Sequence, residues 1–341
     1  SIDLMERASK ACVDWLLRHY CNCDFAVFCG NGNNGGDGLA IARLLTEAGC
    51  RVQIFLKNAK DKSSPDFMLN HERLNNISQI EVIDLAESNL PALSPATIII
   101  DALCGTRLNP TLEGFAKKLV EYINALGNKV VSIDIPSGLL TDLSSKGFTA
   151  IKATQTLTFQ CLKLAMLLPE NEKNIGDVHI LDIGLHPDFL NQLETPFELV
   201  DARMATGLSK PRRAFSHKGT FGHALIIAGS YGKMGAAVLS VKACLRSGAG
   251  LVTAHVPSKG VDIMQISAPE AMCRIDAQTE VVTQIDYDLN AYTAIGVGPG
   301  IGKDQATASL VYDVVTSYKQ PMVIDADALN ILSENEQLLK F

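Results

Sequence analysis

The chain has 341 residues, of which 47% are hydrophobic and 20% are charged, and its formal net charge is −7. This length and composition are typical of a globular protein with two domains. The charges are spread along the chain without acidic or basic blocks, so nothing indicates nucleic acid or an anionic membrane surface as a partner, and we expect a small-molecule partner. No run approaches the roughly 20 apolar residues of a membrane span, and no signal peptide is recognisable.

The nine cysteines are scattered, and several lie within apolar runs, where free cysteine behaves as a small hydrophobic residue. This usage favours a reducing compartment, and we expect a cytoplasmic location. Cys21 and Cys23 lack the spacing of a zinc site, and the histidine pair His217 and His223 is isolated, so we expect no metal site at either place. The chain begins at Ser1 within a helical pattern, so we expect further residues upstream.

Helix-period segments alternate with short β-rich runs, which predicts an α/β fold with parallel sheets covered on both faces. A first helix is expected over 4–17, with Trp15 on its apolar face, and a second over 39–48. The strands predicted for the first half of the chain are 25–29, 51–56, 80–85, 97–101, 129–134, 156–159 and 178–183.

Prolines, charges and the lack of a sustained period indicate a boundary within 185–215, and we assign the domains to 1–198 and 199–341. A second α/β series then begins. Its predicted strands are 224–230 and 251–257, its first helix is 235–250, and the segments 293–302 and 321–330 continue the alternation.

The turn after the first predicted strand reads GNGNNGGDG and covers residues 30–38. Its Gly30, Gly32 and Gly35 have the glycine spacing of a dinucleotide-binding loop. Such a fold should also present an acidic residue to the ribose, but Lys57 follows the second predicted strand at that place. An NAD-dependent dehydrogenase is therefore an alternative that the sequence disfavours. A non-catalytic module that binds a nucleotide or a protein is a second alternative.

Polar turns also follow two other predicted strands, one over 101–110 and one from Asp134. Because the carboxyl ends of parallel strands meet at one edge of the sheet, we expect these turns to converge with the loop over 30–38. Asn34, Asp101 and Ser137 would then form an oxygen-rich cluster of the kind that holds a hard cation. The alternative is that each strand-end aspartate caps its own turn.

Asp37 does not suit a phosphate loop, because a carboxylate at a helix N-terminus competes with phosphate for the same amide groups. An alternative is that Asp37 caps the helix and that Asn33 and Asn34 are left-handed turn residues.

The segments MERA, GNGNNGGDGLAIARLL, DALCGTRLNP, VVSIDIPSGL, TLTFQCLKLAMLL and GDVHILDIGL, in this order, resemble the NAD(P)H-hydrate epimerase domain. The segments that begin SHKGTFGHALIIAGSYGKMG, GVGPGIG and PMVIDADALN are similar to the start of the ADP/ATP-dependent NAD(P)H-hydrate dehydratase. The resemblance implies a Rossmann-like three-layer sandwich followed by a ribokinase-like domain that is truncated.

The same resemblance implies a bifunctional enzyme, an isomerase and a lyase, that repairs hydrated NADH and NADPH. The first domain would interconvert the R and S epimers and use K+. The second would remove water from the S epimer with ADP or ATP and Mg2+. We also expect a homo-oligomer.

The resemblance assigns site residues as follows. The potassium ligands would be Asn34, Asp101 and Ser137, and the catalytic carboxylate Asp134. The substrate-binding residues would be Asn33, Asn34, Gly35, Gly36, Asp37, Gly105, Thr106, Arg107, Leu108, Asn109, Pro110, Thr111, Asp134, Lys163, Ala236, Gly300, Asp325 and Asn330. Whether Asp37 or Lys163 assists Asp134 stays open.

Two departures from the family pattern stand out. Arg107 replaces the usual second glycine of a Gly-Thr-Gly turn, and we expect its side chain to point to solvent. The dehydratase resemblance ends before the Pro-His turn and the Gly-Ser-Gly-Asp turn of the family. We therefore expect this polypeptide to lack dehydratase activity.

Overall fold

The computed structural model describes residues 2–57, 63–74, 77, 80–106, 111–208 and 211–334. The chain divides into two compact units, Ser1–Phe197 and Glu198–Phe341. Within the described ranges, none of the helices combines the length and the apolar character that a membrane span requires.

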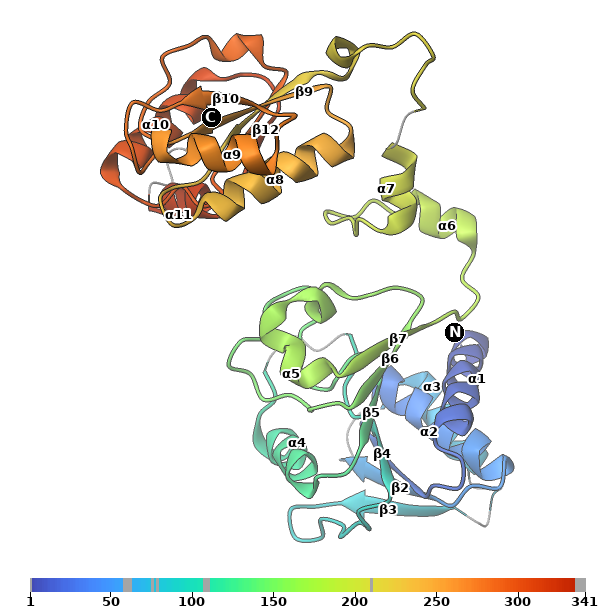
Figure 1. The fold of residues 1–341 in the computed structure, drawn as a ribbon. Coiled ribbons are helices and arrows are strands. Elements are labelled where there is room, and N and C mark those ends of the chain that lie inside the picture. The colour runs from blue at the N-terminus through green and yellow to red at the C-terminus, as the bar shows by residue number, and fades with distance from the viewer. Residues whose placement is uncertain are drawn as a thin grey trace. The chain divides into compact units, whose positions relative to one another are not determined.

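The first unit is built on a seven-stranded parallel sheet with the strand order β3-β2-β1-β4-β5-β6-β7 (Figure 1). The strands are β1 (Phe25–Cys29), β2 (Val52–Lys57), β3 (Glu81–Leu85), β4 (Ile98–Ala102), β5 (Val130–Ile133), β6 (Gln155–Phe159) and β7 (Asp177–Leu181). Every residue of β1 and β4 is buried, which is why these strands read as continuous apolar runs rather than as alternating ones.

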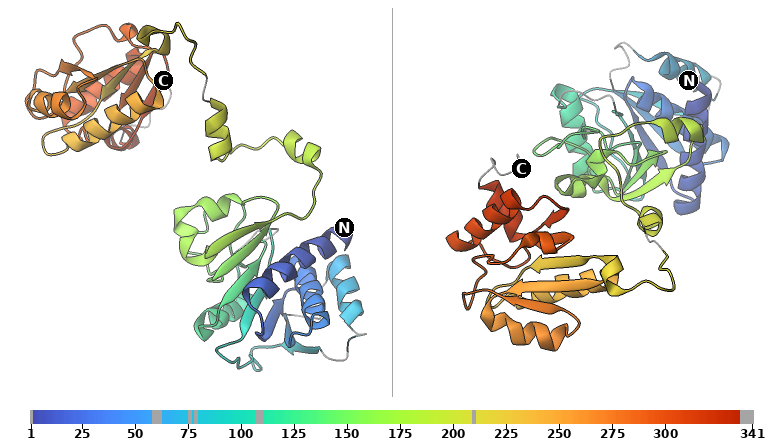
Figure 2. Two further views of the ribbon diagram at one scale, coloured as in Figure 1. Left: turned by 45° about the vertical axis from the view of Figure 1, so that its right-hand side comes forward. Right: turned by 90° about the horizontal axis from the view of Figure 1, so that it is seen from above.

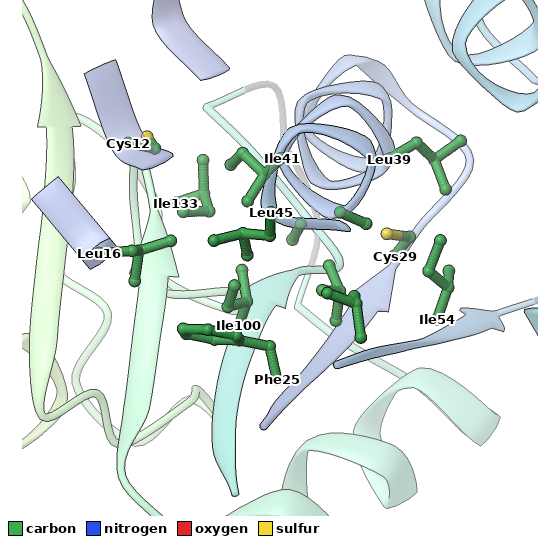
Figure 3. Packing of buried hydrophobic residues seen from close by; sticks show 14 of the residues in the cluster. Cys12, Leu16, Phe25, Cys29, Leu39, Ile41, Leu45, Ile54, Ile100 and Ile133 are labelled. Atoms are coloured by element: carbon green, nitrogen blue, oxygen red, sulfur yellow. The ribbon is translucent and has the colours of Figure 1, made fainter. Parts of the chain in front are cut away.

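Helices cover both faces of this sheet, as Figures 1 and 2 show. One face carries α1 (Ile2–His19), α2 (Asn33–Glu47) and α3 (Pro65–Leu74), and the other carries α4 (Gly114–Leu126) and α5 (Glu172–Ile175). Figure 3 shows the core on the first face, where Leu16 of α1 and Leu45 of α2 pack above Phe25 and Ile100 of the strands. The predicted three-layer α/β sandwich is confirmed, and Trp15 is buried as expected.

The chain leaves β1 in one direction through β2 and β3 and then returns to the other side of β1 with β4. The sheet therefore reverses its order between β1 and β4. A crevice forms at such a switch point, outside the carboxyl ends of the strands, and ligands bind there in open α/β sheets.

The second unit contains a five-stranded parallel sheet with the order β10-β9-β8-β11-β12. Its strands are β8 (His223–Ile227), β9 (Leu251–Val256), β10 (Met272–Ile275), β11 (Ala294–Val297) and β12 (Met322–Ile324). Two separate clusters of buried residues cover the faces of this sheet, one with α8 (Met234–Ser247) and α9 (Val261–Ser267), the other with α10 (Gln305–Ser317) and α11 (Asp327–Ser333).

Two features of the second half of the chain differ from the sequence-based expectation. Strand β10 was not predicted, because most of its residues are exposed and its apolar pattern is weak. The segment over 185–215 contains two short helices, α6 (Pro187–Gln192) and α7 (Ala202–Leu208), that bury none of their residues. Helices without an apolar face leave no periodic signal in the sequence.

Candidate functional site

The loop between β1 and α2 depends on glycine because two backbones approach each other there. A Cβ atom on Gly30 would lie 2.0 Å from the carbonyl oxygen of Leu103, and a Cβ atom on Gly35 would lie 1.7 Å from the carbonyl oxygen of Gly30. Neither distance is compatible with a side chain. The glycine spacing therefore brings the start of α2 against the loop that follows β4.

The start of α2 corrects the alternative in which Asp37 caps the helix. The N-cap is Gly32, no side chain caps the helix, and Asn33 and Asn34 already belong to its first turn. Neither asparagine has a positive φ, so they are not left-handed turn residues. The first amide groups of a helix have no partner within it, and among the described residues no side chain caps those of α2.

A cavity of about 380 Å³ lies at this crevice. Its walls come from the loop after β1, the segment before α3, the loop after β4, the turn after β5 and the end of β6. The lining residues are Gly32, Asn33, Asn34, Asp37, Ser64, Leu103, Cys104, Gly105, Thr106, Asp134 and Phe159.

Asp101 lies behind this cavity and is completely buried. Its Oδ2 accepts hydrogen bonds from Ser132 Oγ at 2.7 Å and from the amide of Ser137 at 2.9 Å, and its Oδ1 accepts from Ser137 Oγ at 2.6 Å and from the amide of Leu103 at 3.3 Å. Burial raises the pKa of Asp101, and these hydrogen bonds oppose the shift. The carboxyl group thus ties the loop after β4 to the turn after β5.

Asn34, Asp101 and Ser137 meet around the backbone of Cys104, as the predicted oxygen cluster requires. Asn34 Nδ2 donates to the carbonyl oxygen of Cys104 at 2.9 Å, and the amide of Cys104 donates to Ser137 Oγ at 2.8 Å. Asn34 Oδ1 is buried and has no hydrogen-bond partner among the described residues. Leaving a buried acceptor without a donor costs free energy, and a cation bound to Asn34 Oδ1 would offset this cost. The donor set therefore fits a hard cation.

Asp134 follows β5 and has a strained backbone, with a φ of 65°. Its Oδ1 accepts from Lys163 Nζ at 2.6 Å and from the amide of Phe159 at 3.2 Å. Lys163 Nζ also donates to Thr158 Oγ1 at 2.8 Å and to the carbonyl oxygen of Phe159 at 3.0 Å. The side chains of Lys163 and Asp134 are only 12% and 16% exposed. Left-handed backbone at a residue other than glycine is typical of functional sites, where the surrounding structure holds it.

Asp37 faces the same cavity as Asp134 and is 9% exposed. Burial, together with the nearby carboxylates of Asp134 and Asp66, raises the pKa of Asp37 well above its usual range. The cavity therefore has two carboxyl groups in unlike surroundings.

The remaining predicted residues of the first unit separate into four groups. Gly105 and Thr106 line the cavity. Gly35, Gly36 and Thr111 do not line it, and Lys163 is connected to it through Asp134. Residues 107–110, which include Arg107, Leu108, Asn109 and Pro110, lie outside the described residues.

Sequence reasoning missed Ser64, Cys104 and Phe159 as lining residues. Phe159 ends a predicted strand at the same sheet edge, which was an available signal. Ser64 precedes α3, and its Oγ accepts from the amide of Phe67 at 3.2 Å, so its sequence context indicated only a helix start. Burial raises the pKa of the Cys104 thiol to about 11, so this thiol is neutral.

In the second unit Ala236 and Gly300 lie close together. A Cβ atom placed on Gly300 would lie 2.9 Å from the Cβ atom of Ala236. The carbonyl oxygen of Gly300 accepts from Ser230 Oγ at 2.7 Å. Asp325 and Asn330 are exposed.

Sequence reasoning also missed two side chains beside this place. Asp327 accepts a hydrogen bond from the amide of Gly302 at 2.9 Å and lies 3.7 Å from Lys233 Nζ. Both residues stand within motifs that were singled out, but the turns that hold them together are far apart in the sequence.

Comparison with known proteins gives two matching family models. The model "YjeF-related protein N-terminus" matches residues 1–165, and the model "NAD(P)H-hydrate dehydratase" matches residues 224–341. Neither model is that of a dehydrogenase. The expectation that the dehydratase part is lacking gains no support, because the second model matches through the last residue.

The bifunctional NAD(P)H-hydrate repair enzyme of Moorella thermoacetica is 33% identical over 99% of this chain and 67% of that protein. The enzymes of the same name from Coxiella burnetii and Escherichia coli are each 32% identical over 98% of this chain, and the matches cover 67% and 63% of those proteins. The chain thus spans about two thirds of the length of these relatives.

Among solved structures, an ADP/ATP-dependent NAD(P)H-hydrate dehydratase from Bacillus subtilis is 30% identical over 37% of this chain and 45% of that chain, with a TM-score of 0.33. On the strength of the full-length relatives, the chain belongs to the family of bifunctional NAD(P)H-hydrate repair enzymes.

Proposed function

We propose that residues 1–198 form an NAD(P)H-hydrate epimerase domain, which interconverts the R and S forms of hydrated NADH and NADPH. The observation that carries the proposal is the shared cavity. Asp134, held by Lys163, and the asparagine pair of α2 line one space at the switch point of the sheet. This is the place where an α/β sheet binds nucleotide-like ligands.

Epimerisation requires a proton donor and a proton acceptor beside carbon 6 of the nicotinamide ring. In the hydrate, carbon 6 of the nicotinamide ring carries a hydroxyl group and is bonded to the ring nitrogen. Inversion requires loss and return of this hydroxyl, or reversible opening of the ring. General acid or base assistance to such a step is worth roughly 10²–10⁴-fold in rate. We assign this role to Asp134, because its carboxylate reaches the cavity and is held in place by Lys163.

Binding of the substrate follows from the groups around the cavity. The open amide groups at the start of α2 favour a negatively charged or carbonyl oxygen. The side chains of Asn33 and Thr106 add donors and acceptors at the rim. We assign the rest of the contact surface to the loop after β4, from Gly105 to Thr111.

We further propose that the cluster of Asn34, Asp101 and Ser137 holds K+. Asn34 Oδ1 supports this assignment, since it is a buried acceptor that no described donor satisfies. When bound, the ion would supply positive charge beside the buried carboxyl group of Asp101. Carbonyl, carboxylate and hydroxyl oxygens are the ligands that such ions take.

We propose that the second unit is part of a dehydratase domain. In the whole protein this domain would remove water from the S form with ADP or ATP and Mg2+. The dehydratase model over residues 224–341 supports this proposal. Ala236 and Gly300 pack against each other and would form the early part of the hydrate site, to which we also assign Asp325 and Asn330.

The decisive experiment supplies one pure epimer of NADPH hydrate and follows the other epimer by chromatography, with the rate in buffer subtracted. We expect the chain to interconvert the epimers and Asp134→Asn to lose at least 100-fold in rate. Asp84→Asn, an exposed aspartate on β3, is the matched control and should keep the full rate. Absence of interconversion by the unaltered chain would remove the proposal.

A further inference from the structure

Asp37 and Asp134 line one cavity, but their carboxyl groups have opposite surroundings. Asp134 accepts from Lys163 Nζ at 2.6 Å and from the amide of Phe159 at 3.2 Å. Among the described residues no donor lies within hydrogen-bond distance of the Asp37 carboxyl group, although the residue is 9% exposed. Its backbone carbonyl oxygen accepts a hydrogen bond from Ser9 Oγ at 3.4 Å.

The charges around Asp37 also disfavour its ionised form. Asp134 and Asp66 of α3 are the acidic neighbours that act on it. From α1, the thiol of Cys12 faces both carboxyl groups, and burial raises its pKa, so it brings no charge. The charge of Lys163 is paired with Asp134, to which its Nζ donates at 2.6 Å. A buried carboxyl group beside another carboxylate holds its proton to higher pH than an exposed carboxyl group does.

We propose that Asp37 is a second catalytic residue, the acid that protonates the departing hydroxyl group, while Asp134 acts as the base that takes the proton of the returning water. This inference rests on the proposed epimerase function. It divides the roles between two carboxyl groups by their surroundings, as many acid and base pairs in enzymes are divided.

The step balances as follows. Asp37 transfers its proton to the hydroxyl oxygen on carbon 6, and the bond between carbon and oxygen breaks with its electron pair on oxygen, so that water leaves. The lone pair of the ring nitrogen forms a double bond to carbon 6, and the resulting cation faces the Asp134 carboxylate. Water then adds to the opposite face of carbon 6 and gives a proton to Asp134. Exchange of protons with solvent returns Asp37 to its protonated form and Asp134 to its ionised form before the next turnover. No oxidant or reductant is needed.

The test compares the full chain with Asp37→Asn, which keeps the size and polarity of the side chain but has no acidic proton to transfer. We expect kcat for epimerisation to fall at least 100-fold, with KM changed by less than about threefold, because the variant still fits the substrate. Asp84→Asn serves again as the control. A variant that keeps kcat within threefold of the unaltered chain overturns the inference, and Asp134 then acts without it.

Two further measurements need no variant. In water labelled with ¹⁸O, loss and return of the hydroxyl group should place the label on carbon 6 of the inverted product, and an unlabelled product overturns the inference. The rate of the unaltered chain should also fall as pH rises through the ionisation of Asp37, and a rate without this alkaline limb overturns it as well. An unaltered chain that does not epimerise removes the proposed function itself, which distinguishes the two failures.

Discussion

Replacing Lys163 by methionine tests whether the ion pair with Asp134 organises the site. In the structure, Lys163 Nζ lies 2.6 Å from Asp134 Oδ1 and 2.8 Å from Thr158 Oγ1. The methionine keeps most of the apolar stem and removes the charge and its donors. It leaves Asp134 with the amide of Phe159 as its donor. A carboxylate that is 16% exposed then loses its counter-ion.

The cost follows from the degree of burial. Breaking a fully buried ion pair by removing one partner costs about 3–5 kcal/mol, whereas exposed pairs contribute about 0–1 kcal/mol. Lys163 and Asp134 are 12% and 16% exposed, which is nearer to the buried limit. We therefore expect Lys163→Met to lower the free energy of unfolding of the first unit by about 2–3 kcal/mol. For a unit of this size, that corresponds to a decrease of roughly 5–10 °C in the unfolding midpoint.

The assay uses the fluorescence of Trp15, the one tryptophan of the chain, which is buried in the first unit. Urea unfolding is measured for Lys163→Met, for Asp134→Asn and for the double variant. Since the two groups contact each other, the double variant should be more stable than the sum of the single effects predicts, by about 1–2 kcal/mol. Additive effects, or a loss below about 0.5 kcal/mol in Lys163→Met, would refute the reasoning.

Three further predictions concern the same unit. Because burial and nearby carboxylates raise the pKa of Asp37, the free energy of unfolding of the unaltered chain should fall as pH rises through that folded-state pKa. Between about pH 5 and pH 9, the free energy of unfolding of Asp37→Asn should fall by less. An equal fall in both proteins, measured by urea unfolding at each pH, would contradict this. Gly35→Ala would place its Cβ atom 1.7 Å from a carbonyl oxygen and should cost about 1–3 kcal/mol or more, whereas Gly32→Ser, at an open N-cap position, should be neutral within about 0.5 kcal/mol by the same fluorescence assay. Replacing Li+ by K+ at constant ionic strength should raise the unfolding midpoint in proportion to the logarithm of the K+ concentration, and Asn34→Leu should abolish the effect; a midpoint that is indifferent to the ion removes the potassium proposal.

The sequence by itself determined the class of fold and the edge of the sheet at which the site lies. Buried parallel strands must be apolar along their whole length, so runs such as Phe25–Cys29 and Ile98–Ala102 were recognisable, and the alternation with helices identified the sheet as parallel. Parallel strands point their carboxyl ends to one edge, which is why polar turns separated by up to about a hundred residues could be expected to meet. That expectation is confirmed for Asn34 and Asp134, which line one cavity.

Only the tertiary structure decided what the individual side chains do there. The partner of Asp134 is 29 residues away, and the lack of donors around Asp37 depends on α1, α3 and the loop after β5 packing around it. The structure also shows that Asp37 lies inside the helix and does not cap it, and that Gly30 and Gly35 allow two backbones to approach closely. Periodicity and turn chemistry are local properties, whereas burial, electrostatic neighbours and unsatisfied acceptors arise from contacts between distant segments.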